Sequence, residues 1–262
     1  MSTCPRGHVA SECSDFQTRT SLVDRIQTID RPRQYRDCYR PLAREAGSRA
    51  KGVPGLHVCR SDVGDPASIE SLYKTVSDRF PLLDTLVNNA GTMRNIKLAQ
   101  PNQLGDLTTE IDGNLKGPMW MIQAFLPLLL RQKSSLIVNV SSGLAFIPFP
   151  AAPIYSASKA ALHAYTQCLR AQLEDSCVSV VELAPPGTET PLFRSEFAEE
   201  MKGEKGMDVS VLVRRTIAGI EAGKTEIRPG ASNVLKIASR VAPHFMFRQL
   251  VKLGRPRSGV GT

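Results

Sequence analysis

The sequence has no apolar run of the roughly 18 residues that a membrane-spanning helix needs. Its longest candidate, residues 119–130, is interrupted by Gln123 and Pro127. The N-terminal residues contain no apolar core of the kind that marks a secretory signal. The six cysteines are scattered without a Cys-x-x-Cys pair, and the four histidines are isolated along the chain. We therefore expect free thiols in a reducing, cytoplasmic compartment, and we expect no metal site.

Acidic charge is scarce at both ends of the chain. The formal net charge is +8, and residues 1–53 carry ten Lys/Arg against six Asp/Glu. Residues 224–262 carry eight against one, whereas residues 54–223 carry fifteen against eighteen. A nucleic-acid-binding protein typically has a basic stripe, interleaved with aromatic side chains, on its folded body. Because the positive excess lies at the ends, we expect no nucleic-acid partner, and weak attraction to acidic surfaces stays open.

Apolar patterning in the centre of the chain predicts alternating strands and helices, and 262 residues suffice for one α/β domain. Asp65 and Pro66 are typical of a helix start, and Ile69, Leu72 and Val76 follow at helical spacing. Further helices are predicted over residues 103–132, 155–173 and 209–222, and strands over residues 55–59, 83–87, 136–140, 178–183 and 225–228.

Ser142, Tyr155 and Lys159 carry the chemistry that the sequence predicts. Ser142 follows a run typical of a buried parallel strand, and the carboxyl ends of such strands hold ligands. Tyr155 and Lys159 are four residues apart, so a helix places them on the same face. Because an ammonium favours the phenolate, we expect Lys159 to lower the pKa of Tyr155 from its usual value of about 10. Tyr155 then exchanges a proton with a ketone or alcohol oxygen that Ser142 holds.

This arrangement resembles the active site of the classical short-chain dehydrogenase/reductase family. Two further stretches agree, namely Leu86-Val-Asn-Asn-Ala-Gly91 and Asn114, which lies 28 residues before Ser142. The resemblance covers about residues 54–191. It implies a Rossmann-like doubly wound parallel sheet in a single domain. It also implies an NAD(P)-dependent oxidoreductase that interconverts a carbonyl and an alcohol on a small organic substrate.

The resemblance further implies a role for each matching residue. Tyr155 is the acid–base, Lys159 also binds the cofactor ribose, Ser142 orients the substrate oxygen, and Asn114 accompanies a helix kink and supports a proton relay. Arg40 suits the 2′-phosphate of NADP, with NAD as the alternative. The family habit is a homodimer or homotetramer. The implied cofactor contacts are Asp62, which is alternatively a turn residue, Asn89, Tyr155, Lys159, Thr188 and Thr190.

Glycine is scarce where this family needs it. Gly7 is the only glycine in the first 46 residues, whereas the family opens with a glycine-rich turn that approaches the cofactor pyrophosphate. Residues 1–37 are therefore an altered first βα unit or residues foreign to the ancestral fold, and we favour the second. The alternative function is a catalytically impaired member of the fold, a binding protein, scaffold or non-functional product, that lost its pyrophosphate loop.

The predicted organisation is an atypical segment over residues 1–37, a Rossmann-like domain over 38–253 and a disordered tail over 254–262. Residues 21–30 are compatible with a short helix, and residues 192–207 with a mobile loop over the substrate. Residues 234–250 are predicted to form one amphipathic, basic helix. We expect its apolar face to pack on the core, on a partner subunit or, less readily, on a membrane.

Overall fold

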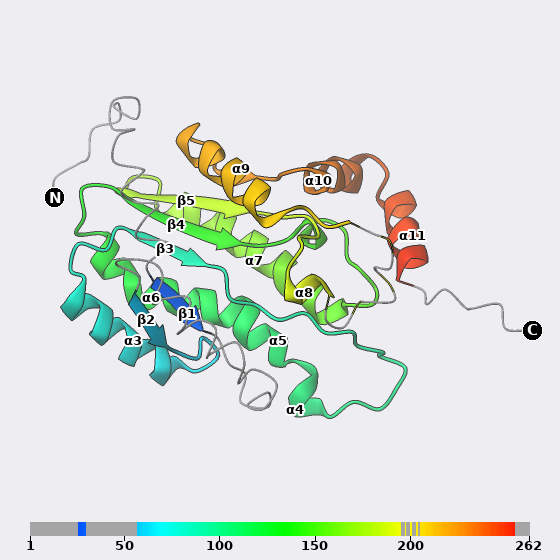
Figure 1. Cartoon of the computed structure of the whole chain (residues 1–262), viewed down its shortest axis with the longest axis horizontal. Coiled ribbons are helices and arrows are strands. Elements are labelled where there is room, and N and C mark those ends of the chain that lie inside the picture. Colours follow the sequence, from blue (N-terminus) through cyan, green and yellow to red (C-terminus); the bar gives the residue numbers. More distant parts are fainter. Residues whose placement is uncertain are drawn as a thin grey trace, which may run out of the picture. The chain divides into compact units, whose positions relative to one another are not determined.

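The computed structural model describes residues 57–194 and 205–254, residues 197, 200 and 203, and the backbone of residues 26–29 (Figure 1). Arg40, most of the predicted N-terminal segment and the tail beyond Gly254 lie outside the described residues. The chain divides into two compact units. Unit 1 comprises residues 1–91, 112–139 and 166–181, and unit 2 comprises residues 92–111, 140–165 and 182–262.

Unit 1 contains a two-stranded parallel sheet of β1 (Ile26–Ile29) and β2 (His57–Arg60), in which Ile26 pairs with His57. The prediction of a helix over residues 21–30 is therefore wrong at residues 26–29. Their sequence, Ile-Gln-Thr-Ile, contains three β-branched residues, which favour a strand that has a partner to pair with.

The second sheet has the strand order β3-β4-β5-β6. β3 (Thr85–Asn88) pairs in parallel with β4 (Ser135–Val140), and Figure 1 shows the two arrows running side by side. β5 (Val178–Leu183) pairs in parallel with β6 (Glu226–Ile227). All residues of β4 except its last are buried, as expected for a parallel strand covered on both faces.

Helix α3 (Pro66–Arg79) begins as its sequence predicts. The Asp65 side chain accepts a hydrogen bond from Ala67 N at 3.1 Å, and Pro66 occupies the first turn, where its missing N–H costs nothing. Ile69, Leu72 and Val76 are buried, and the helix packs against α6 (Gly117–Leu129). The helical spacing of apolar residues thus identified both the helix and its buried face.

The helix predicted over residues 103–132 is divided into several pieces. α4 (Leu104–Leu107) and α5 (Thr109–Ile111) are followed by a π-helical turn, η2 (Asp112–Lys116), and then by α6. Asn114 lies in the π-helical turn and is fully buried, so it is not a solvent-facing residue. Gly117 follows the turn, and a Cβ there would lie 2.9 Å from Val63 O, so the close approach of that backbone requires glycine.

In unit 2, the short 3₁₀ helix η3 (Gly143–Ala145) leads into α7 (Pro153–Gln172), whose first turns reach a buried apolar cluster. Leu250 and Leu253 of α11 (Pro243–Leu253) and residues of α8 (Pro191–Arg194) pack against this cluster. Phe197, in the predicted mobile loop, is fully buried. The cluster consists of Met93, Phe149, Ala152, Tyr155 and Phe197.

The C-terminal part of unit 2 is helical. α9 (Val209–Glu221) is capped by Asp208, which accepts from Ser210 N at 2.8 Å. The single helix predicted over residues 234–250 is wrong, because two helices, α10 (Ala231–Val241) and α11, meet at Ala242. Pro243 explains the break, since it has no N–H to donate and disfavours a helical conformation at the preceding residue. Within the described part of the chain, no helix combines the length and apolarity that crossing a membrane demands.

Candidate active site

Three predicted catalytic residues lie together in unit 2. Ser142 follows β4 and precedes η3, where its Oγ accepts a hydrogen bond from Leu144 N at 3.1 Å. Tyr155 lies in the first turn of α7, and Lys159 lies one turn further along the same face. All three side chains are buried.

The Tyr155 hydroxyl is hydrogen-bonded to the Ser142 side chain. The Lys159 ammonium donates to Val140 O at 2.9 Å and lies 5.7 Å from the centroid of the Tyr155 ring. One oxygen or nitrogen from each residue type that the sequence singled out therefore meets at the carboxyl end of β4. A carbonyl oxygen placed at this end of the strand has two hydroxyl donors within reach.

Burial decides the protonation of this site. It raises the pKa of Tyr155 to about 12, because a phenolate out of water is unfavourable. The Ser142 hydrogen bond opposes that rise, and the negative charge of Glu110 adds to it. Burial also lowers the pKa of Lys159 to about 8. The direction for Tyr155 is opposite to our expectation, because loss of hydration outweighs the attraction between phenolate and ammonium.

Glu110, at α5, is a buried carboxylate that the sequence did not single out. Its Oε1 accepts from Arg94 N at 3.1 Å, and its Oε2 lies 3.6 Å from Arg94 Nε. Arg94 also pairs with Asp106 at 2.9 Å. Glu110 thus anchors the segment that follows Gly91 while adding negative charge near Tyr155. A glutamate in a polar helical stretch gives no signal of this placement.

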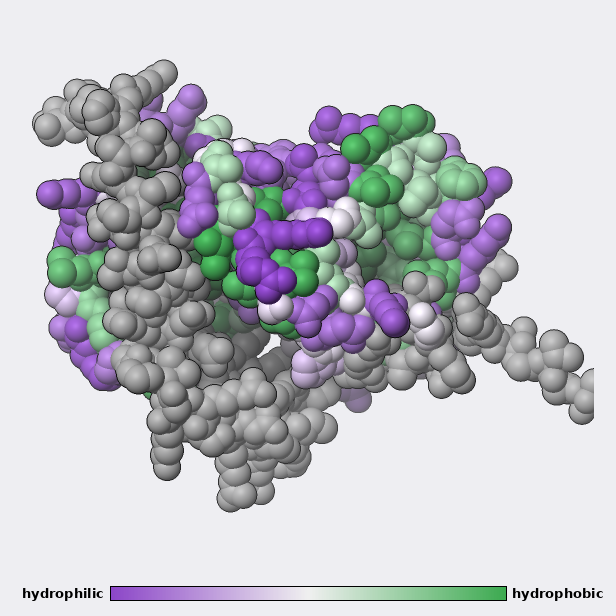
Figure 2. Space-filling view, turned by 45° about the horizontal axis from the view of Figure 1, so that its top comes forward, coloured by the Kyte–Doolittle hydropathy of each residue, from purple (hydrophilic) through white to green (hydrophobic). Residues whose placement is uncertain are grey.

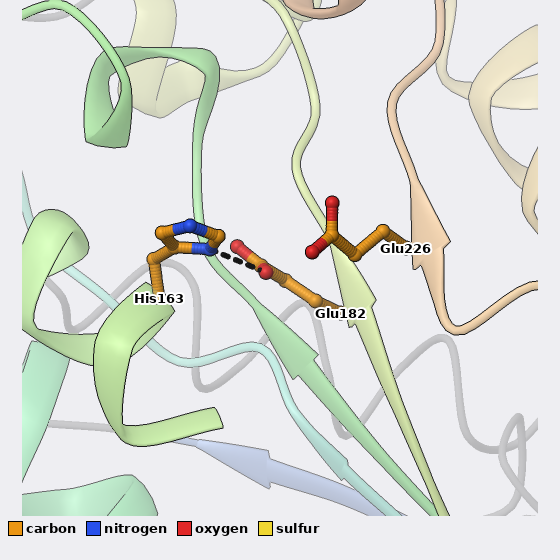
Figure 3. A group of neighbouring side chains, drawn as sticks. All are labelled: His163, Glu182 and Glu226. Carbon is orange, nitrogen blue, oxygen red and sulfur yellow. Dashed lines mark hydrogen bonds and ion pairs between the residues drawn. The ribbon is translucent and has the colours of Figure 1, made fainter. Parts of the chain in front are cut away.

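A second buried polar network continues along α7 (Figure 3). His163 lies one turn beyond Lys159, and its Nδ1 is 2.6 Å from Glu182 Oε2 on β5. The other oxygen of Glu182 accepts from Ser141 Oγ at 2.5 Å. Burial alone would raise the pKa of Glu182, but its hydrogen bonds to His163 and Ser141 hold the pKa below its usual value. This carboxylate therefore fixes Ser141, the residue before Ser142.

Glu226 approaches the same network, so the expectation that the histidines are isolated is wrong for His163. Atoms of His163, Glu182 and Glu226 that are able to bind a metal all lie within 4.8 Å of one another. Each of them already has a partner, because His163 Nε2 faces the Lys236 ammonium at 3.2 Å and Glu226 pairs with Arg228. A neutral ring that donates through Nδ1 and accepts at Nε2 satisfies both contacts. The geometry therefore favours an ion-pair network over a metal site.

The predicted residues of unit 1 have separate surroundings. Asn88 donates to Asn139 at 2.8 Å, and Asn139 donates to Thr166 at 3.0 Å, so Asn88 braces β3 against β4 and α7. Asn89 is exposed at the end of β3. Asp62 accepts from Gly64 N at 2.9 Å, which is the turn geometry that the sequence left as its alternative role.

Thr188 and Thr190 follow β5 in unit 2. The Thr188 hydroxyl donates to Pro186 O at 2.9 Å, and that of Thr190 donates to Thr188 O at 3.2 Å. Backbone pairing between Thr188 and Met207 closes the loop that carries them. Both hydroxyls keep acceptor lone pairs, but their protons hold the local backbone.

Comparison with known proteins identifies the family. The sequence profile of the short chain dehydrogenases matches residues 41–201. The uncharacterized oxidoreductase DltE of Bacillus subtilis is 34% identical over 217 residues, which cover 81% of this chain and 84% of that protein. The chain belongs to the short-chain dehydrogenase family. The profile match begins close to Cys38, where we expected the resemblance to resume.

Solved structures of other short-chain dehydrogenases confirm the predicted Rossmann-like α/β fold. A short-chain dehydrogenase from Sphingobium yanoikuyae in complex with NADPH superposes with a TM-score of 0.67 at 20% identity, covering 94% of this chain and 93% of that one. A family member from Burkholderia phymatum in complex with NAD gives 0.65 at 20% identity, covering 84% and 85%. At these identities the likeness establishes the fold.

The donor set of unit 2 fits one end of the cofactor that binds to such dehydrogenases. A buried ammonium and a phenol hydroxyl one helical turn apart are suitable donors for a ribose, and the Ser142 hydroxyl is next to them. The glycine-rich turn for the pyrophosphate is absent from the sequence before residue 47. The described residues therefore fit the nicotinamide and ribose part of the molecule.

Proposed function

We propose that this short-chain dehydrogenase interconverts a carbonyl and an alcohol on a small organic substrate, with NADP, or alternatively NAD, as its cofactor. The observation that carries the proposal is the buried group of Ser142, Tyr155 and Lys159 at the carboxyl end of β4. The NADPH and NAD complexes of the two similar structures support a nicotinamide cofactor.

Tyr155 is the proton donor and acceptor in this proposal. With a pKa of about 12, its hydroxyl is protonated at neutral pH and is ready to protonate a carbonyl oxygen during reduction. Ser142 hydrogen-bonds the same oxygen and holds it near Tyr155. Lys159, which is mostly an ammonium below its pKa of about 8, stabilises the phenolate that remains. The cofactor, when bound, supplies or accepts the hydride.

Cofactor contacts follow the same assignment. Tyr155 and Lys159 hold the nicotinamide ribose, and Thr188 and Thr190 offer their acceptor lone pairs to the carboxamide. In unit 1, Asp62 and Asn89 contact the adenosine part, and Asn114 supports a proton relay from its π-helical turn, a deviation often found at functional sites. The carbonyl or alcohol substrate itself is a small molecule.

A second function, a binding or scaffold role without turnover, is favoured by the single glycine among the first 46 residues. Titration of the purified chain with NADPH and NADH, followed by nucleotide fluorescence, separates the two. We expect saturable micromolar binding that weakens in a Tyr155→Phe, Lys159→Ala variant, and turnover in a screen of ketones. A folded chain that binds neither nucleotide at millimolar concentration would refute the enzymatic function.

Assembly and location remain predictions. The homodimer or homotetramer expected of the family has a candidate seam on α7, where Ala157, Ala160 and Ala164 present little side-chain bulk to a second helix. Sedimentation equilibrium of the wild type and of an Ala160→Arg variant tests that seam, which would be refuted by equal masses for an oligomeric wild type and the variant. The cytoplasmic location of the chain is proposed from its unpaired cysteines, of which Cys59, Cys168 and Cys177 are free among the described residues.

A further inference from the structure

Helices α10 and α11 expose a group of large apolar side chains, which we call the α10–α11 apolar face. Hydrophobic residues gather over these two helices in the space-filling view, with hydrophilic residues around them (Figure 2). On α10 three of them recur at a spacing of three and four residues, which forms one stripe along the helix. The face consists of Val234, Ile237, Val241, Phe245 and Phe247, which are 60%, 57%, 79%, 60% and 41% exposed.

Other sides of the same helices already pack on the core of unit 2. Ser232 on α10 is fully buried against Gly143, where an added Cβ would lie 2.8 Å from Ser232 Oγ. Leu250 and Leu253 on α11 pack on the cluster that contains Tyr155. Each helix is therefore held by a different face, and the exposed apolar residues do not take part in these contacts with the core.

The charge around the α10–α11 apolar face has a single sign. Residues 229–262 contain six Lys/Arg and no Asp or Glu. Of those in the described helices, Arg240, Arg248 and Lys252 are exposed, whereas Lys236 turns inward to His163. Exposed apolar side chains ringed by basic ones have the composition of a helix that lies in the interface of an anionic bilayer.

We propose that the α10–α11 apolar face docks on the surface of an anionic phospholipid bilayer. A second copy of the chain fits this face poorly, because an isologous contact would bring the basic residues of both copies together. A bilayer offers acyl chains to the apolar side chains and phosphates to Arg240, Arg248 and Lys252. Membrane docking does not depend on catalysis, although both helices contact the surroundings of Ser142 and Tyr155.

Co-sedimentation of the full chain with vesicles tests the proposal. We expect the wild type to bind vesicles of 70% phosphatidylcholine and 30% phosphatidylserine at 0.1 M salt, and pure phosphatidylcholine much more weakly. Changing Val234, Ile237, Val241 and Phe245 to Ser is expected to weaken binding at least about 100-fold, because each loses apolar surface to bury. Changing Arg240, Arg248 and Lys252 to Gln is expected to weaken binding about 100-fold, at roughly fivefold for each residue.

Matched controls make the test specific to this face. Leu82 and Leu98 are 80% and 63% exposed elsewhere on the chain, and changing them to Ser should leave vesicle binding unchanged. A Phe245→Trp variant reports insertion directly, because its added emission should move to shorter wavelength with anionic vesicles. Circular dichroism and thermal unfolding of each variant confirm that the chain still folds.

Three results would overturn the proposal. The first is a wild type that stays in solution with anionic vesicles at 0.1 M salt. The second is vesicle binding that survives the four serine substitutions, which would reduce it to unspecific attraction of basic residues. The third is a chain that self-associates without binding vesicles and becomes monomeric when the four serines are introduced, which would assign the face to a second copy.

Discussion

Replacing Lys159 with methionine is predicted to stabilise the protein while inactivating it. The Lys159 side chain is 3% exposed, and burial lowers its pKa from 10.5 to about 8. That difference means that burying the ammonium costs about 3 kcal/mol of folding free energy at neutral pH. Methionine has a similar length and no charge. It removes this cost but also removes the hydrogen bond to Val140 O, which is worth about 1–2 kcal/mol.

The net expectation for Lys159→Met is a rise of about 1–2 kcal/mol in the free energy of unfolding at pH 7, measured by urea denaturation. Turnover should fall by at least about 100-fold, because Tyr155 loses the charge that stabilises its phenolate. Lys116→Met is the matched control, since Lys116 is 51% exposed beside Asp112 and its loss should change stability by less than about 0.5 kcal/mol.

The pH dependence gives a second, independent readout of the same group. Between pH 8 and pH 10.5 the unfolded chain keeps the Lys159 proton that the folded chain has released. The free energy of unfolding of the wild type should therefore rise with pH across that window, relative to Lys159→Met. Above pH 10 the raised pKa of Tyr155 acts in the opposite direction, so the comparison is best made between pH 8 and 10. A variant that is less stable than the wild type at pH 7, with parallel pH curves, would refute the reasoning.

Three further changes test the site and its supports. Tyr155→Phe should lower carbonyl reduction by about 10²–10⁴-fold while nucleotide binding weakens little, because the ring remains and only the proton donor is lost; unchanged steady-state rates would contradict its role. Glu182→Gln should cost about 1–3 kcal/mol at pH 7, and this difference should shrink below pH 4.5, where the wild-type carboxylate becomes protonated and its stabilisation is lost as pH falls through its lowered pKa; an acid unfolding curve parallel to that of the wild type would speak against the network. Gly143→Ala should lower the melting temperature, because its Cβ would meet Ser232 at 2.8 Å and push α10 outward, whereas Gly105→Ala, which meets nothing within 4 Å, serves as the control; equal effects would disprove that packing.

Local patterns predicted much of the framework. The Asp65 cap, Pro66 and the buried positions of α3 follow from interactions within one helix, which the order of residues specifies directly. The all-apolar run of β4 indicated a buried parallel strand in the same way. The failures were also local in origin: the helix over residues 234–250 was drawn through Pro243, and the strand at residues 26–29 exists through pairing with β2.

The sequence by itself determined which groups do the chemistry, because Tyr155 and Lys159 are one helical turn apart and Ser142 ends the preceding strand. Only the tertiary structure decided how those groups behave. The pKa of Tyr155 rises because burial removes its water, and burial depends on segments distant in the chain, from Met93 to Phe197. His163 and Glu182, 19 residues apart, likewise become partners through the placement of α7 beside β5. Charge and hydration act through space, so their effects appear only when the folded chain brings those segments together.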